Sequence, residues 1–239
     1  MIVKKIKTIL YSIITICFTF CFTIAQGTLT PVYASENSSK VIFVGDSRTV
    51  QMRNYLGTDD TYVCLGSMGY NWFMSTALPE VNAIKEPGDI IVFNFGVNDL
   101  YQINNYIAEM NYLIENDWAD CTVYYMSVNP VNDAKTATYG GVTNAGVESF
   151  NQALINGLSD KIRWIDTYSA SLGAINTDAS KSDAMGVHYS ADIYQLYYDM
   201  VQQRIQSDKE NEVVQQVLNR VKEKFMDIFE NVKMVTAID

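Results

Sequence analysis

The sequence is poor in the residues that build metal sites and disulfide frameworks. It has one histidine and four cysteines in 239 residues, and two of the cysteines, Cys17 and Cys21, lie in an apolar stretch near the N-terminus. The other two, Cys64 and Cys121, allow one disulfide, but buried free thiols are the simpler interpretation in a domain of this size. No histidine–cysteine cluster has the spacing of metal ligands. The sequence therefore requires neither a metal nor an organic cofactor.

The sequence is also short of positive charge. Its 17 Lys and Arg are outnumbered by 27 Asp and Glu, which gives a formal net charge of −10. Lys4, Lys5 and Lys7 belong to the first 34 residues, which contain no acidic residue, so the rest of the chain carries 14 minus 27, or −13. A charge of this sign disfavours nucleic acid and anionic membrane surfaces as partners.

The first 34 residues have the pattern of an export signal. Their lysines precede an apolar run over 9–25, and Val32-Tyr33-Ala34 offers small residues where a signal peptidase reads them. An uncleaved membrane anchor is the alternative, because the run is close to the length of a membrane span. In both cases we expect the chain from about Ser35 onward outside the cell, secreted or associated with the cell surface. After cleavage it would have no stable membrane contact.

Apolar runs and helical patterns alternate through the rest of the chain. The runs without polar alternation lie at 41–44, 62–65, 90–95, 122–126 and 162–165, and the helical patterns at 49–56, 71–84, 100–116, 143–159 and 190–206. Such runs are typical of strands buried on both faces of a parallel sheet. The alternation predicts one α/β domain over 38–207, doubly wound, with its chemistry at the carboxyl ends of the strands.

The segment 208–239 differs in character from this domain. Its apolar residues follow one another at intervals of four and three: Val214, Leu218, Val221, Phe225, Ile228, Val232 and Val235. This spacing predicts an amphipathic helix with a heptad seam. The seam either docks on the surface of the chain's own domain or joins copies of the chain in a homo-oligomer.

Polar residues and glycines follow three of the predicted strands. The first strand ends in Gly45-Asp46-Ser47-Arg48, which puts a serine at a strand-to-helix turn, where helix N–H groups can stabilise negative charge. Gly66 and Gly69 follow the second strand, and Gly96-Val97-Asn98-Asp99 follows the third. The first and third blocks also have a plain structural explanation, since Asp, Ser and Asn are common helix caps.

The only histidine, His188, lies just before the last helical pattern of the domain. A serine is a weak nucleophile and needs an adjacent base, for which histidine is the usual choice. In this order the four blocks resemble those of the SGNH (GDSL-type) hydrolases, a family of serine esterases. The resemblance spans roughly residues 40–206 and implies a flavodoxin-like three-layer α/β/α sandwich with a five-stranded parallel sheet.

The resemblance also implies roles for particular residues. Ser47 would be the nucleophile and His188 its base. The oxyanion hole would consist of the Ser47 and Gly69 backbone N–H groups and the Asn98 side chain, with Gly66 as the alternative to Gly69. Asp46 and Asp99, which accompany these residues in the blocks, would serve as turn and network residues.

The histidine block departs from the family's pattern. It usually reads Asp-x-x-His, but Met185 occupies the position of the aspartate, and the nearest acid is Asp183, five residues before His188. Three interpretations follow. Asp183 fills the role through a rearranged loop, a backbone carbonyl orients the histidine in a dyad, or the site is degraded.

Together these features predict a secreted esterase that hydrolyses short acyl esters, above all acetyl esters, on a carbohydrate or cell-wall substrate. The same site would serve an acyltransferase acting on cell-surface sugars. Met185 and the heptad tail would also suit a catalytically weak glycan-binding or scaffold protein. Tyr70, Trp72 and Tyr189 lie beside the blocks and would either stack on sugar rings in the cleft or pack between helices and sheet.

Overall fold

The computed structural model describes residues 39–139 and 141–236. These residues form one unit that begins at Ser39. The predicted export signal, residues 1–34, lies outside them. Within the two described ranges, no helix combines the length and the apolar character needed to cross a membrane.

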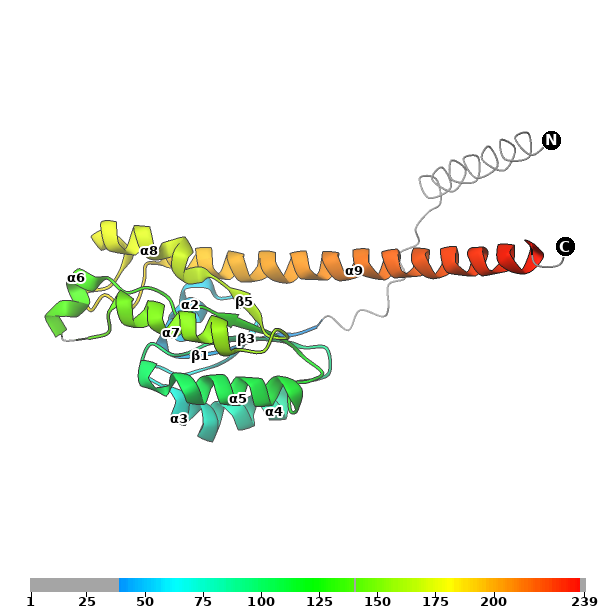
Figure 1. Ribbon diagram of the computed structural model, residues 1–239. Coiled ribbons are helices and arrows are strands. Elements are labelled where there is room, and N and C mark those ends of the chain that lie inside the picture. The colour runs from blue at the N-terminus through cyan, green and yellow to red at the C-terminus, as the bar shows by residue number, and fades with distance from the viewer. Residues whose placement is uncertain (1–38, 140, 237–239) are drawn as a thin grey trace. The chain divides into compact units, whose positions relative to one another are not determined.

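Five strands form a single parallel sheet in the order β2-β1-β3-β4-β5 (Figure 1). They are β1 (Val41–Gly45), β2 (Thr61–Cys64), β3 (Ile90–Asn94), β4 (Thr122–Met126) and β5 (Arg163–Ile165). This order confirms the predicted flavodoxin-like sheet. The strand order reverses between β1 and β3, so the loops after these two strands diverge and leave room for a site at their carboxyl ends.

Helices cover both faces of the sheet. The helices with α labels are α2 (Ser47–Leu56), α3 (Tyr70–Trp72), α4 (Leu78–Ile84), α5 (Ile103–Glu115), α6 (Asp133–Thr136), α7 (Asn144–Gly157), α8 (Thr167–Thr177) and α9 (Ala191–Thr236). A π-helical turn, η1 (Phe73–Ala77), joins α3 to α4, and short 3₁₀ turns are η2 (Leu100–Gln102), η3 (Ala137–Tyr139) and η4 (Ala179–Lys181). One core lies between the sheet and η1, α4, α5 and α7, and a second lies between the sheet and α2, α8 and α9.

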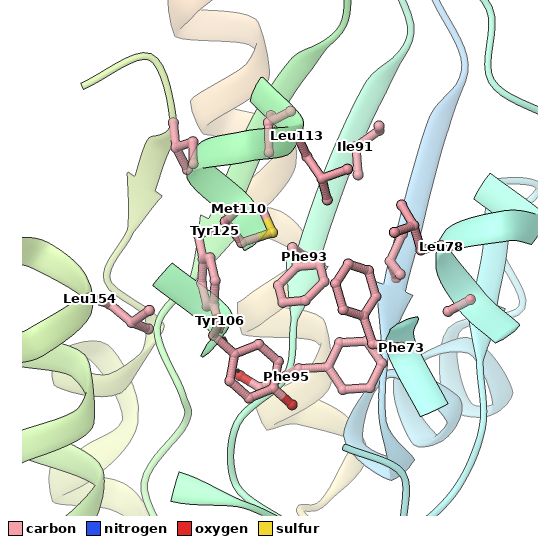
Figure 2. Packing of buried hydrophobic residues seen from close by; sticks show 14 of the residues in the cluster. Phe73, Leu78, Ile91, Phe93, Phe95, Tyr106, Met110, Leu113, Tyr125 and Leu154 are labelled. Carbon is pink, nitrogen blue, oxygen red and sulfur yellow. Dashed lines mark hydrogen bonds between the residues drawn. The ribbon is translucent and has the colours of Figure 1, made fainter. Parts of the chain in front are cut away.

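Alternate residues of each central strand enter opposite cores. Ile91 and Phe93 of β3 face the first core, whereas Ile90 and Val92 face the second. Figure 2 shows the first core, in which the Phe93 ring packs against Phe73 of η1, Tyr125 of β4 and Phe95 just after β3. The strands are therefore buried on both faces, which explains why their sequences lack polar alternation.

The structure differs from the predicted elements at α8, at 71–84 and at 190–239, and it adds the short helix α6. Helix α8 was not predicted, because its serines, threonines and Gly173 are weak helix formers and Asp166, which caps it, resembles a turn residue. The pattern at 71–84 consists of α3, η1 and α4 in succession. The patterns at 190–206 and 208–239 belong to one continuous helix, α9, so the expected boundary at 207 falls inside a helix.

The two cysteines of the domain are free. Cys64 ends β2 and Cys121 precedes β4, and these strands are separated in the sheet by β1 and β3. The thiols are free, as expected, but both side chains are half-buried rather than buried.

Candidate active site

A serine, a histidine and an aspartate form a chain of hydrogen bonds at the carboxyl edge of the sheet. The Ser47 Oγ lies 2.9 Å from the His188 Nε2, and the His188 Nδ1 lies 2.9 Å from a carboxylate oxygen of Asp183. When Nδ1–H donates to Asp183, Nε2 is left to accept the hydrogen bond of the Ser47 hydroxyl. This is the arrangement that a histidine needs to act as a general base toward a serine.

A tight hairpin explains how Asp183 reaches a histidine five residues away. The Asp183 N–H donates to the His188 carbonyl at 2.9 Å, and the residues just outside this pair form an antiparallel bridge. Gly186 turns the chain with a φ of 77°, a conformation that glycine adopts readily. Met185 lies at this turn and is 52% exposed. The geometry corresponds to the first of the three interpretations, a rearranged loop in which Asp183 contacts the histidine.

The hairpin also sets the charge state of Asp183. Burial alone would raise the pKa of this carboxyl, but hydrogen bonds from the His188 ring and from the N–H groups of His188 and Val187 lower it by more. The net effect is a pKa below the usual value. Asp183 is therefore an anion at neutral pH, which favours the imidazolium that forms when His188 takes up a proton.

Ser47 is the first residue of α2, directly after β1. Asp46 caps this helix, because its carboxylate accepts a hydrogen bond of 2.9 Å from the Arg48 N–H. The first N–H groups of a helix have no partner inside the helix and lie at the positive end of its dipole. The cap explanation of this block is thus correct for Asp46, and it leaves the Ser47 N–H available to developing negative charge.

Two side chains after β3 hold the loop that follows β2. The Asn98 Nδ2 donates to the Met68 carbonyl at 2.7 Å. The Asp99 carboxylate accepts from the Tyr70 N–H at 2.6 Å and from the Tyr106 hydroxyl at 2.9 Å. The predicted oxyanion donors of the second and third blocks are therefore adjacent to one another, and Asp99 is the network residue that the resemblance implied.

The two candidate glycines have different neighbours. A Cβ at Gly69 would lie 2.2 Å from an Asp99 carboxylate oxygen, so a side chain cannot fit there without displacing Asp99. A Cβ at Gly66 would meet only the Ser47 Cβ, at 4.0 Å. Gly69 also precedes α3 as its N-cap residue. Packing thus requires glycine at 69, whereas Gly66 is the glycine that borders the serine.

Arg48 is a contributor to this site that the sequence did not identify. Its side chain is buried, its Nε donates to the Val187 carbonyl at 3.0 Å, and its Nη1 donates to the Asn129 carbonyl at 2.9 Å. The guanidinium carbon lies 5.3 Å from the centre of the Tyr189 ring. Arg48 therefore contacts the residues on both sides of His188. No sequence signal marks this role, because a charged residue in a first helical turn usually faces solvent.

The aromatic residues beside the blocks pack into the protein. Tyr189 is buried, and its hydroxyl donates to the Pro130 carbonyl at 2.6 Å, so it cannot line a substrate cleft. Tyr70 and Trp72 are half-buried and pack on Tyr106 and Phe95 respectively. The packing explanation therefore holds for Tyr189, because its ring covers the Arg48 guanidinium and α9 closes over it.

Comparison with solved structures identifies the fold. No family model and no curated protein matches this chain. A GDSL-like lipase from Bacteroides thetaiotaomicron is similar over 71% of this chain and 89% of its own, at 17% identity and a TM-score of 0.57. A lipase/acylhydrolase from Enterococcus faecalis covers 71% of this chain and 96% of its own, at 14% identity and a TM-score of 0.53.

An acetylxylan esterase from Geobacillus stearothermophilus is similar over 70% of this chain and 94% of its own, at 12% identity and a TM-score of 0.51. At these identities the likeness concerns the fold. The chain has the fold of the SGNH (GDSL-type) hydrolases, as its sequence blocks predicted.

Replacement of Asp46 by asparagine tests the electrostatics beside the serine. Burial raises the pKa of Asp46 from 3.8 to about 6, although Arg48 opposes the shift. Because the folded protein holds this proton more tightly than the unfolded chain, the contribution of Asp46 to stability is greatest below pH 4 and is lost as the pH rises through 6. The parent should therefore lose about 2–3 kcal/mol of unfolding free energy between pH 4 and pH 7 that Asp46→Asn does not lose, since asparagine does not titrate. Urea unfolding of both proteins at pH 4 and pH 7 measures the effect. If the difference in unfolding free energy between variant and parent were the same at both pH values, the shifted pKa of Asp46 would be contradicted.

Alanine at the two glycines should separate their structural roles. Gly69→Ala forces its new Cβ against Asp99 and should lower the free energy of unfolding by about 1–3 kcal/mol, as overpacking generally does. Gly66→Ala is the matched control and should stay within about 0.5 kcal/mol of the parent, since its Cβ meets no closer atom than the Ser47 Cβ. Urea unfolding of both variants measures the two losses of unfolding free energy. Equal losses would show that contact with Asp99 does not exclude a side chain at position 69.

Proposed function

We propose that this protein is a serine esterase in which Ser47, His188 and Asp183 form the catalytic triad. The observation that supports this most directly is the unbroken hydrogen-bond chain from the Ser47 Oγ through the His188 ring to the Asp183 carboxylate. A structural histidine needs a hydrogen bond, but it does not need a serine at a helix start on one nitrogen and an anion on the other.

In the proposed reaction, the Ser47 Oγ attacks the ester carbonyl carbon while its proton passes to the His188 Nε2. The tetrahedral intermediate collapses when the carbon–oxygen bond to the alcohol breaks, and His188 returns the proton to the leaving alcohol. A water molecule, deprotonated by the same nitrogen, then attacks the acyl carbon. The bond from this carbon to the Ser47 Oγ breaks, His188 returns the proton to Ser47, and the acid is released. Asp183 keeps the ring oriented and compensates its positive charge in both halves of the reaction.

The oxyanion of this intermediate would form at the start of α2, beside the loop after β2. The Ser47 N–H lies at the positive end of α2, and the backbone N–H of Gly69 and the Asn98 amide would complete the hole, with Gly66 in reserve. Asn98 now donates to the Met68 carbonyl. We therefore expect its amide to turn partly toward a bound substrate, or to use its second hydrogen.

The proposed substrates are short acyl esters, above all acetyl esters of a carbohydrate or cell-wall polymer. Export, which the first 34 residues predict, would bring the enzyme to such polymers, and an acetylxylan esterase shares its fold. An acyltransferase would use the same serine and the same oxyanion hole, with a sugar hydroxyl in place of water. A scaffold protein would keep the fold without the reaction.

Hydrolysis of p-nitrophenyl acetate by the purified protein tests the proposal. Turnover should fall to background in Ser47→Ala and should be unaffected by Ser75→Ala, which removes an exposed serine on η1. A fluorophosphonate probe should add its mass once to the parent and not to Ser47→Ala. Labelling of Ser47 without hydrolysis would favour the acyltransferase, and an unlabelled parent would contradict the esterase and favour the scaffold.

The identity of the triad acid can be tested on the same substrate. Asp183→Asn keeps the shape of the hairpin but removes the anion, so kcat should fall roughly 10³- to 10⁴-fold. Met185→Ala changes the residue at the family's usual aspartate position, and it should leave kcat within about threefold because Met185 lies exposed at the turn. If Asp183→Asn retained full activity, His188 would have to act as a dyad base oriented by the backbone.

A further inference from the structure

Helix α9 leaves the domain partway along its length. Its first four turns bury Ile193, Tyr197, Val201 and Ile205 in the second core. Its last polar contact with the sheet among the described side chains is the ion pair of Glu212 with Arg163, 2.7 Å long. From there the helix continues to Thr236, and Figure 1 shows it running on past the end of the sheet.

The outer half of α9 presents an apolar stripe to solvent. Val214, Leu218, Phe225 and Ile228 are each more than half exposed, and Val221 between them is half-buried. Their spacing of four and three residues continues in the sequence to Val232 and Val235. Exposed apolar residues in such a continuous stripe indicate an interaction surface rather than scattered surface positions.

The stripe cannot fold back on the chain's own domain. Residues 191–236 contain no glycine or proline, and the helix is continuous through the point where it leaves the sheet. A return to the domain would require a break in that helix, and the helix has no break between Ala191 and Thr236. Of the two placements that the sequence left open, docking on the same domain is therefore inconsistent with the structure.

We propose that the outer half of α9 binds the same segment of other copies of this chain, in a parallel, in-register coiled coil. A strict seven-residue repeat fits partner helices with the same repeat. Seams of equal period stay in contact along their whole length as the helices supercoil. The seam has Leu218, Phe225 and Val232 at one set of core positions, a, and Val214, Val221, Ile228 and Val235 at the other, d.

The choice of side chains favours three or four copies over two. Parallel dimers prefer β-branched residues at a and leucine at d, whereas leucine at a with β-branched residues at d shifts the preference to larger assemblies. Here every d residue from 214 to 235 is valine or isoleucine, and two of the three a residues, Leu218 and Phe225, are not β-branched. A larger bundle also buries a wider stripe, and Val217, which flanks the seam, is 50% exposed in the single chain.

The charges beside the seam are compatible with the parallel register. Lys222 and Lys224 occupy the flanking positions e and g in the middle of the segment. In a parallel, in-register bundle, Lys222 lies opposite Val217 and Lys224 opposite Phe229 of the neighbouring copy. No two lysines are then opposed, and their aliphatic stems can cover the apolar neighbours while the ammonium groups stay in water.

The oligomeric state of the purified protein tests this proposal independently of its enzymatic activity. Light scattering after size-exclusion chromatography should give three or four times the protomer mass, and Leu218→Glu with Phe225→Glu should reduce it to one protomer. Gln216→Glu with Asn219→Glu adds the same charge on the outward side of the helix and should leave the mass unchanged. Because all four side chains lie outside the two cores, the thermal midpoint of the domain should be the same in both variants.

Disulfide cross-linking tests the direction of the helices. With Cys64 and Cys121 replaced by serine, a cysteine at Val214 or at Ile228 should link to its counterpart on oxidation, since identical d positions meet in a parallel bundle. A cysteine at Gln216, on the outward side, should not link. A monomeric parent protein would overturn the proposal. A monomer that cosediments with lipid vesicles would also overturn it, and would indicate that the stripe binds a membrane surface. An oligomer that cross-links at neither d position would overturn the parallel register.

Discussion

The parallel pairing of β1 with β3 in the middle of the sheet fixes where the polar groups of the candidate site lie. It brings the carboxyl ends of both strands to one edge, where the strand order reverses. Both strands are buried on both faces, so neither can slip in register without moving its apolar side chains out of two cores at once. Ser47 follows one of these strands and Asn98 the other, and their separation is thereby fixed by the sheet.

A buried polar network connects this edge to the histidine. Arg48 binds the backbone on either side of the site, Asp46 caps the helix that begins with the serine, and Asp99 secures the loop after β2. Burying such groups is costly unless they are hydrogen-bonded, so the network restricts the loops to few arrangements. The histidine hairpin is closed by its own backbone bonds and then held by Arg48 from the opposite side.

Much of this organisation could be predicted from the chain alone, and the exceptions have physical causes. The central strands β1, β3 and β4 were identifiable because residues buried on both faces are almost all apolar. The edge strands β2 and β5 are only partly buried but still form short apolar runs. Helix α8 was missed because its stability comes from packing rather than from propensity. Tyr189 was a candidate for the cleft by its place in the sequence, but its ring is buried between the Arg48 guanidinium and Tyr197 of α9.

The layer architecture and the order of the polar blocks follow from the amino-acid sequence, because hydrophobic periodicity and strand-end residues are local properties of the chain. The heptad seam could be predicted for the same reason, since the spacing of its apolar residues is also a local property. Three features could be recognised only in the folded chain: Asp183 contacts His188, Arg48 hydrogen-bonds to the histidine loop, and the helix that carries the seam extends beyond its own domain. These features depend on contacts between segments far apart in the chain or on how a loop closes. Neither can be predicted from the spacing of residues along the sequence.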